Sequence, residues 1–164
     1  PGDENMGIFT GAQLLTMQEV AGKVHAAMQN LGRGEEEFGI IHADLLLHNI
    51  LFHEGEARGL DWEYSGWGYF LYDLTPLLWQ MKPLPNYAEI QAALWDGYTS
   101  IRPLTEEHRN LLETLIAGRQ VASMRWVAAN QRNPHYAGKV ERILAQRTAE
   151  LRNFLDTGTL NRST

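Results

Sequence analysis

The sequence has no cysteine among its 164 residues. Disulfide bonds, thiolate nucleophiles and cysteine-based zinc sites are therefore excluded, and we expect a protein of the reducing cytoplasm. Apolar runs stay well short of the roughly 18 residues that would suggest a membrane span. The first residues carry neither a basic nor an apolar segment, so we expect no secretion signal.

Clusters of positive charge are also missing. The formal net charge is -6, and no block of lysine and arginine occurs anywhere in the chain. Nucleic-acid binding proteins need such a block to neutralise phosphates, so we expect neither a nucleic-acid nor a membrane partner. A net negative charge favours solubility and is compatible with a cationic substrate.

The composition, 44% hydrophobic and 21% charged, is typical of a globular protein. The length of 164 residues is enough for one domain. Apolar periodicity and turn residues predict an α+β fold that is mostly helical, with a small β element. We expect a linker remnant over 1–11, one lobe over 12–157 and a flexible tail over 158–164. The predicted helices are 12–31, 73–81, 87–101, 105–130 and 134–155, the predicted strands are 38–41, 50–52 and 58–60, and 63–70 is predicted to be an ordered loop.

Polar residues interrupt the apolar segment "IIHADLLLHNILF" in a chemically specific pattern. Positions 42–49 follow the His-x-Asp-x-x-x-x-Asn spacing of the protein-kinase catalytic loop, with Ala43 where arginine stands there. A carboxylate such as Asp44 can orient the proton of an acceptor hydroxyl, and the Asn49 amide oxygen can bind a metal from the same loop. A second carboxylate is needed for the metal, and Asp61 at the end of the returning strand can supply it.

These motifs resemble the aminoglycoside phosphotransferase and choline kinase group of protein-kinase-like small-molecule kinases. In that group the loop is followed by a hairpin, an aspartate at a strand end and a Gly-x-x-x-x-Asp-Leu segment, which Gly68–Leu74 matches. The resemblance extends from Ala12 to about Leu78. It implies a kinase that transfers the γ-phosphoryl group of ATP, with Mg²⁺, to a hydroxyl of a small molecule.

The resemblance also implies roles for individual residues. Asp44 would be the catalytic base, and Asn49 and Asp61 would bind magnesium and the nucleotide phosphates. His42, within the catalytic loop, and Asp73 would hold that loop in place.

Two features depart from the family pattern. Leu46, Leu47 and His48 stand where many relatives have shorter or more polar residues. In addition, no Gly-rich phosphate loop and no strand lysine occur, so the chain resembles a C-terminal lobe whose N-terminal nucleotide lobe would precede residue 1.

Several residues are candidates for the acceptor site, which we expect between the catalytic loop and the last helices. Aromatic rings can line such a site, but at helical spacing they more often pack in the core. The candidates beside the motifs are His48, Trp62, Glu63 and Trp67; weaker candidates are Tyr98, Trp126 and Tyr136, and core positions are expected for Trp79, Trp95 and Trp126.

Two alternatives remain open from the sequence. The chain could be a non-catalytic binding module, because it lacks the nucleotide lobe. It could also be a metal-dependent hydrolase in which His42, Asp44, His48 and Asp61 bind zinc or manganese. The acceptor of a kinase could be an aminoglycoside, an amino alcohol or a sugar, since the loop chemistry is the same for all three.

Overall fold

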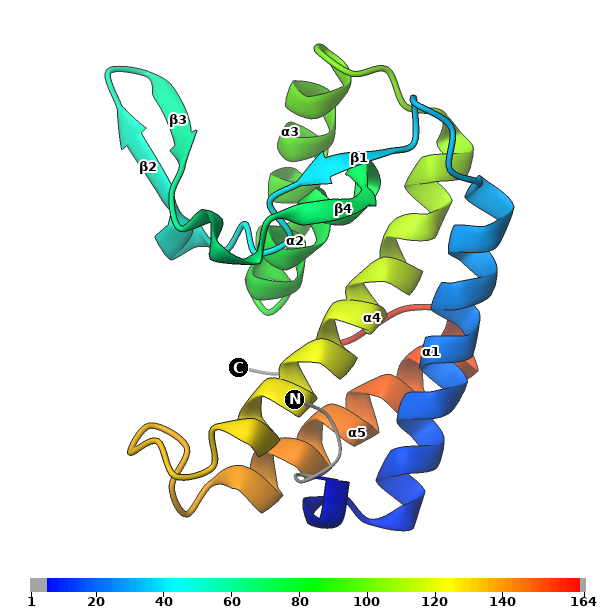
Figure 1. Cartoon of the computed structure of the whole chain (residues 1–164), viewed down its shortest axis with the longest axis vertical. Coiled ribbons are helices and arrows are strands. Elements are labelled where there is room, and N and C mark those ends of the chain that lie inside the picture. Colours follow the sequence, from blue (N-terminus) through cyan, green and yellow to red (C-terminus); the bar gives the residue numbers. More distant parts are fainter. Residues whose placement is uncertain (1–5, 163–164) are drawn as a thin grey trace.

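A computed structural model describes residues 6–162 of the chain, and it confirms the predicted class: mostly helical, with small antiparallel sheets (Figure 1). Among the described residues, no helix combines the length and apolar character needed to cross a membrane. The helices are α1 (Gly11–Leu31), α2 (Thr75–Met81), α3 (Tyr87–Thr99), α4 (Glu106–Ala129) and α5 (Val140–Thr157), and the strands are β1 (Phe38–Ile41), β2 (Ile50–His53), β3 (Glu56–Gly59) and β4 (Gly66–Tyr69).

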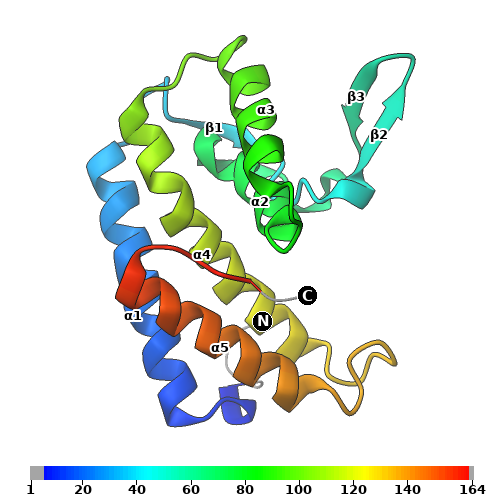
Figure 2. The same cartoon turned by 180° about the vertical axis from the view of Figure 1, so that it is seen from behind.

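The core forms where α1, α4 and α5 meet. Helices α1 and α4 run side by side and α5 crosses them, as the two opposite views show (Figures 1 and 2). Val20, Ile116 and Leu151, one from each helix, are completely buried. Apolar contacts of this kind supply most of the stability of a small domain. The long helix α4 begins at Glu106, directly after Thr105, the N-cap residue that the sequence predicts.

A two-stranded antiparallel sheet joins β1 to β4, although the sequence predicts a loop over 63–70. That prediction is wrong for 66–69. In the sheet Gly39 lies opposite Gly68, the Phe70 ring packs over Gly39, and the Ile41 side chain packs over Gly68. A Cβ atom at either glycine would overlap those side chains, so the glycines allow the pairing rather than break it.

Strands β2 and β3 form the predicted hairpin, which pairs Ile50 with Gly59 at its base. Its turn residues Glu54 and Gly55 both have positive φ angles, 50° and 82°. The hairpin extends away from the helices (Figure 1). It therefore connects residues 42–49, called the catalytic loop after the motif they match, to Asp61 without contributing to the core.

The C-terminal part differs from the prediction in two places. Helix α5 begins at Val140 rather than at Pro134, because residues 134–139 form turns in which Gly138 takes a left-handed backbone, φ 72°. After α5, Leu160 is completely buried and its N–H donates to Glu113 at 2.9 Å. The segment up to residue 162 is thus packed where the sequence suggests a flexible tail; residues 1–5 and 163–164 lie outside the described residues.

Candidate active site

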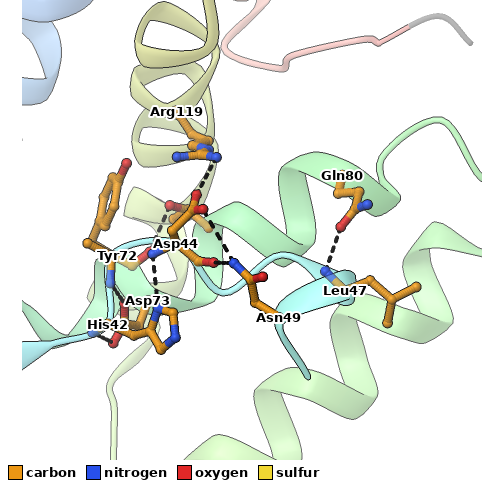
Figure 3. A network of polar contacts seen from close by, with 10 residues as sticks. His42, Asp44, Leu47, Asn49, Tyr72, Asp73, Gln80 and Arg119 are labelled. Atoms are coloured by element: carbon orange, nitrogen blue, oxygen red, sulfur yellow. Dashed lines mark hydrogen bonds and ion pairs between the residues drawn. The ribbon is translucent and has the colours of Figure 1, made fainter. Parts of the chain in front are cut away.

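Asp73 fixes the start of the catalytic loop from behind. Its two carboxylate oxygens accept hydrogen bonds from the backbone N–H groups of His42, at 2.8 Å, and Ala43, at 2.7 Å (Figure 3). Ala43 has a left-handed backbone, with φ 66°. Burial raises the pKa of the Asp73 carboxyl, and the two backbone hydrogen bonds partly oppose that shift. Asp73 therefore holds the loop without touching the space in front of it.

The His42 ring is held from both sides in this structure. The side chain is buried, and Nε2 donates to the Leu60 carbonyl oxygen at 2.7 Å. A carbonyl only accepts, so Nε2 carries the hydrogen and Nδ1 faces the Asp44 N–H, 3.4 Å away. The Trp62 ring lies against the imidazole with centroids 4.7 Å apart. Both nitrogens are engaged, which ties the catalytic loop to the end of β3.

Asp44 and Asn49 are joined across the loop. The Asn49 Nδ2 donates to the Asp44 backbone carbonyl at 2.9 Å and lies 3.4 Å from its Oδ2. The amide oxygen of Asn49 has no hydrogen-bond partner among the described residues and points away from Asp44 (Figure 3). The loop thus fixes the amide so that its oxygen remains available as a ligand.

Asp61 directly follows Leu60, whose backbone is hydrogen-bonded to the catalytic loop. The Leu60 N–H donates to the Asn49 carbonyl oxygen at 2.8 Å, and Asp61 follows with a left-handed backbone, φ 61°. Its side chain is exposed and makes no ion pair within residues 6–162. An amide oxygen and a carboxylate suit Mg²⁺, which often takes one or two protein ligands and completes its shell with phosphate and water oxygens.

A metal-dependent hydrolase would need more ligands than this. Among the described residues, no group of three or more histidine and acidic side chains could hold a metal ion. His42, one of the four ligands of that alternative, uses its ring on Leu60 and Trp62 instead. The described residues therefore do not bring the four ligands of the hydrolase alternative together.

Arg119 is the main residue of the site that no sequence motif indicates. Its guanidinium donates to Asp44 Oδ1 at 2.7 Å, and both side chains are largely buried (Figure 3). Tyr72 lies beside the pair: burial raises the pKa of its phenol, while Arg119 acts in the opposite direction. The available signal was an arginine on the α4 face that also carries buried Leu115 and Ile116, a position where an unpaired charge is rare.

A cavity of about 600 Å³ opens in front of Asp44. This volume is within the range of pockets that bind small molecules. Its wall contains the catalytic loop on one side and helices α4 and α5 on the other, as the sequence predicts for an acceptor site. The lining residues are Ala43, Asp44, Leu46, His48, Tyr64, Trp79, Arg119, Ala122, Ser123, Trp126, Tyr136 and Arg147.

Only some of the residues that the sequence suggests for the acceptor site line the cavity. His48, Trp126 and Tyr136 line the cavity, whereas Trp62, Glu63, Trp67 and Tyr98 do not. Trp62 packs on the catalytic loop and donates from Nε1 to the Gly59 carbonyl oxygen. Trp67 is 74% exposed beside Phe38.

The tryptophans show the same division. Trp79 and Trp95 are buried, as predicted, but Trp126 is 50% exposed, so its predicted core position is wrong. Its ring instead meets Tyr64 edge-on at 6.4 Å, and both residues line the cavity.

The unusual leucines of the loop have structural roles. Leu46 packs against the hydrophobic core and lines the cavity. The Leu47 N–H donates to the Gln80 side chain at 2.7 Å, so helix α2 also holds the loop (Figure 3). The departure from the family pattern is therefore accommodated by packing and by a bond to α2.

Comparison with known proteins gives a consistent result. Residues 10–104 match the pattern of the phosphotransferase enzyme family. A homoserine kinase from Polaromonas naphthalenivorans is 31% identical over 150 residues, which are 82% of this chain and 46% of that protein. A homoserine kinase from Gluconobacter oxydans is 34% identical over 84 residues, covering 49% of this chain and 27% of that protein. The chain thus spans less than half the length of these curated relatives.

Two solved structures share the fold. The microcompartment-associated aminopropanol kinase superposes with a TM-score of 0.77 and 22% identity, over 92% of this chain and 48% of that one. The amicoumacin kinase hAmiN, solved with AMP-PNP, Ca²⁺ and Ami, superposes with a TM-score of 0.75 and 16% identity, over 99% of this chain and 51% of that one. At these identities the likeness shows the fold alone.

Proposed function

This chain belongs to the phosphotransferase enzyme family, and we propose that it is the acceptor-binding lobe of an ATP-dependent kinase that phosphorylates a hydroxyl of a small molecule. The observation that carries the proposal is the placement of Asp44. Its carboxylate lines a cavity of about 600 Å³, and the fixed amide of Asn49 lies directly behind it. One group can thus face an acceptor while its neighbour faces a metal and the phosphates.

The residues of the loop divide the work of phosphoryl transfer. Asp44 orients the acceptor hydroxyl toward the γ-phosphorus and accepts its proton as the new O–P bond forms, while the bond from the γ-phosphorus to the bridging oxygen breaks and ADP leaves. The Asn49 amide oxygen and the Asp61 carboxylate would hold Mg²⁺, which neutralises charge on the transferring phosphate. His42 and Asp73 keep these groups at fixed separations, and such positioning supplies much of the rate enhancement in this reaction class.

Nucleotide binding needs further residues. The relatives are about twice as long as the part they share with this chain, so we propose that a nucleotide-binding lobe precedes residue 1 in the whole protein. By itself, the 164-residue chain would then bind Mg-ATP weakly. Binding at sub-millimolar concentration, measured by calorimetry, would show that this lobe is not required.

The acceptor is a small molecule that carries a hydroxyl and, by comparison with the names of the relatives, an amine. Homoserine and aminopropanol, which appear in those names, share both groups and differ in a carboxylate. The cavity has room for either.

Asp44→Asn in the longest natural form of the protein tests the proposal. We expect phosphoryl transfer to fall by about 10²–10⁴-fold, the usual contribution of a positioned base, while Mg-ATP affinity stays nearly unchanged. Asp96→Asn is a matched control, because Asp96 is exposed on α3 and lies outside the cavity wall. Wild-type turnover by Asp44→Asn would show that the assigned role is wrong.

A further inference from the structure

Resting on this function, we propose that Arg119 and Arg147 form an anion-binding subsite in the cavity and that it takes a carboxylate of the acceptor. The acceptor is then a hydroxy amino acid rather than a purely cationic amino alcohol or aminoglycoside. This inference reverses what the overall charge of -6 suggests, because the cavity differs in charge from the rest of the molecule.

The charge of the cavity wall is the first observation. Among residues 6–162, two guanidinium groups line it, and the only lining carboxylate is that of Asp44, which already accepts a hydrogen bond from Arg119. The acidic residue nearest in sequence to the aromatic wall, Glu63, is not among the lining residues. Without an acceptor, the wall therefore carries more positive than negative charge.

Arg147 supplies the second observation. One of its guanidinium nitrogens donates to the Ser123 carbonyl oxygen at 3.1 Å. Within residues 6–162 it makes no ion pair at salt-bridge distance. Burial lowers the pKa of Arg147; Tyr136 and Glu150 oppose that shift, and Arg119 adds to it. A bound anion would stabilise this partly desolvated cation.

Glu150 does not fill that role in the cavity wall. It is 6% exposed, and its carboxylate accepts from Gln120 at 2.5 Å and from Gln146 at 3.1 Å. It lies behind the wall rather than in it, since it is absent from the lining residues. The carboxylate that opposes the pKa shift of Arg147 is therefore already bonded to two amides.

Arg119 supplies the third observation. Its Nε is unpaired among the described residues but buried, so the Nη groups, of which Nη2 bonds Asp44, are the donors that can reach an acceptor. The Ser123 side chain, which also lines the cavity, likewise makes no hydrogen bond within the part of the chain that the structure describes. Arginine presents five N–H donors in a rigid fork, so one guanidinium can hold Asp44 and still have donors for a second carboxylate.

This arrangement would set the orientation of the acceptor. The hydroxyl end would face Asp44 and the carboxylate end would face Arg147, with Arg119 between them. The aromatic pair Tyr64 and Trp126 lines the same cavity and offers ring faces that attract an ammonium group. A molecule with a hydroxyl, an amine and a carboxylate would use all three regions.

A pair of probes tests the subsite without any mutation. Homoserine and 3-amino-1-propanol have the same hydroxyl and amine on the same chain, and only homoserine has the carboxylate. We expect the 164-residue chain, titrated with each by nuclear magnetic resonance, to bind homoserine about tenfold or more tightly, as one charge-assisted contact implies. Equal or tighter binding of 3-amino-1-propanol would overturn the subsite and leave the proposed kinase function intact. Binding of neither probe would overturn the subsite and the acceptor cavity together.

Variants locate the effect. Arg147→Met should reduce the ratio of the two affinities to about one, and Arg147→Lys should keep part of it because the charge remains. Arg142→Met is a matched control: Arg142 is exposed on the same helix, outside the cavity wall. An unchanged ratio in folded Arg147→Met would contradict the assignment. If that variant does not fold, Arg147→Lys and the wild-type comparison still decide.

Discussion

The catalytic loop (residues 42–49) and the β2–β3 hairpin follow one another in the chain, yet they are held in opposite ways. Side chains from outside the loop bind its backbone: Asp73 takes two N–H groups and Gln80 takes a third. The hairpin pairs only with itself and extends from the body (Figure 1). Its apolar residues Leu51 and Phe52 are 47% and 66% exposed.

The comparison shows that regular structure and rigidity are separate properties. An isolated two-stranded hairpin is marginally stable in water, because it buries little apolar surface. The irregular loop is fixed more firmly, since Asp73, Gln80 and the Asn49 side chain bind its backbone at four points. The proposed hydroxyl-orienting group thus stands on the firmly held segment, and Asp61 stands where the two segments meet.

Of the changes considered for the loop and the hairpin, removing the Asp73 carboxylate should lower the free energy of unfolding most. Asp73→Ala leaves the N–H groups of His42 and Ala43 without acceptors in a partly buried site, which costs about 2–4 kcal/mol of the free energy of unfolding. Urea unfolding followed by circular dichroism measures this loss. Asp96→Ala, at an exposed site on α3, should change the free energy by less than about 0.5 kcal/mol. Equal losses in the two variants would show that the loop does not depend on Asp73.

The ionisation of Asp73 should also make the free energy of unfolding depend on pH, with an effect smaller than that of Asp73→Ala. Burial raises the pKa of its carboxyl above the ordinary 3.8, so the folded state holds the proton more strongly than the unfolded state. The protonated Asp73 carboxyl therefore stabilises the folded state. This contribution is fully present below pH 3.8, the pKa of the unfolded state, and is lost as the pH rises through the higher pKa of the folded state. The free energy of unfolding, measured for wild type minus Asp73→Asn, should increase as the pH falls through that window. A difference that decreases on acidification would contradict the sign.

A hairpin substitution should have the smallest effect. Phe52→Ser changes a side chain that is 66% exposed, so the free energy of unfolding should change by less than about 0.5 kcal/mol. Hydrogen exchange on the same protein should show fast exchange for hairpin amides and slow exchange for the Ala43 amide. A cost above about 1 kcal/mol would mean that the hairpin packs against the lobe and that the contrast with the loop is overstated.

Local patterns predicted most of the fold. Apolar periodicity predicts α1 and α4 within a few residues, and strand patterns and a Gly turn predict the β2–β3 hairpin. Strand β4 could not be predicted in this way, because its pairing depends on Ile41 and Phe70 packing over two facing glycines. The start of α5 could not be predicted from Asn133 and Pro134, because residues 134–139 form turns and Gly138 takes a left-handed backbone before the helix begins.

Some residues of the candidate site can likewise be predicted from local sequence, and others only from tertiary packing. Asp44 and Asn49 are five residues apart, so a local spacing shows them; the same motif-based comparison indicated Asp73. Arg119 and Arg147 stand on helices with no recognisable motif, and only tertiary packing brings them to the loop. Sequence thus predicted the residues proposed for phosphoryl transfer, whereas those proposed for acceptor recognition required the structure.

The contact between Arg119 and Asp44 has a consequence for how the protein folds. It joins residues 75 positions apart, and closing so long a segment costs entropy that local contacts do not repay. Helix α4 must therefore reach its place before Asp44 is held, however early the catalytic loop takes shape. In a refolding chain, binding competence should appear together with the last long-range contacts and later than most of the helix content.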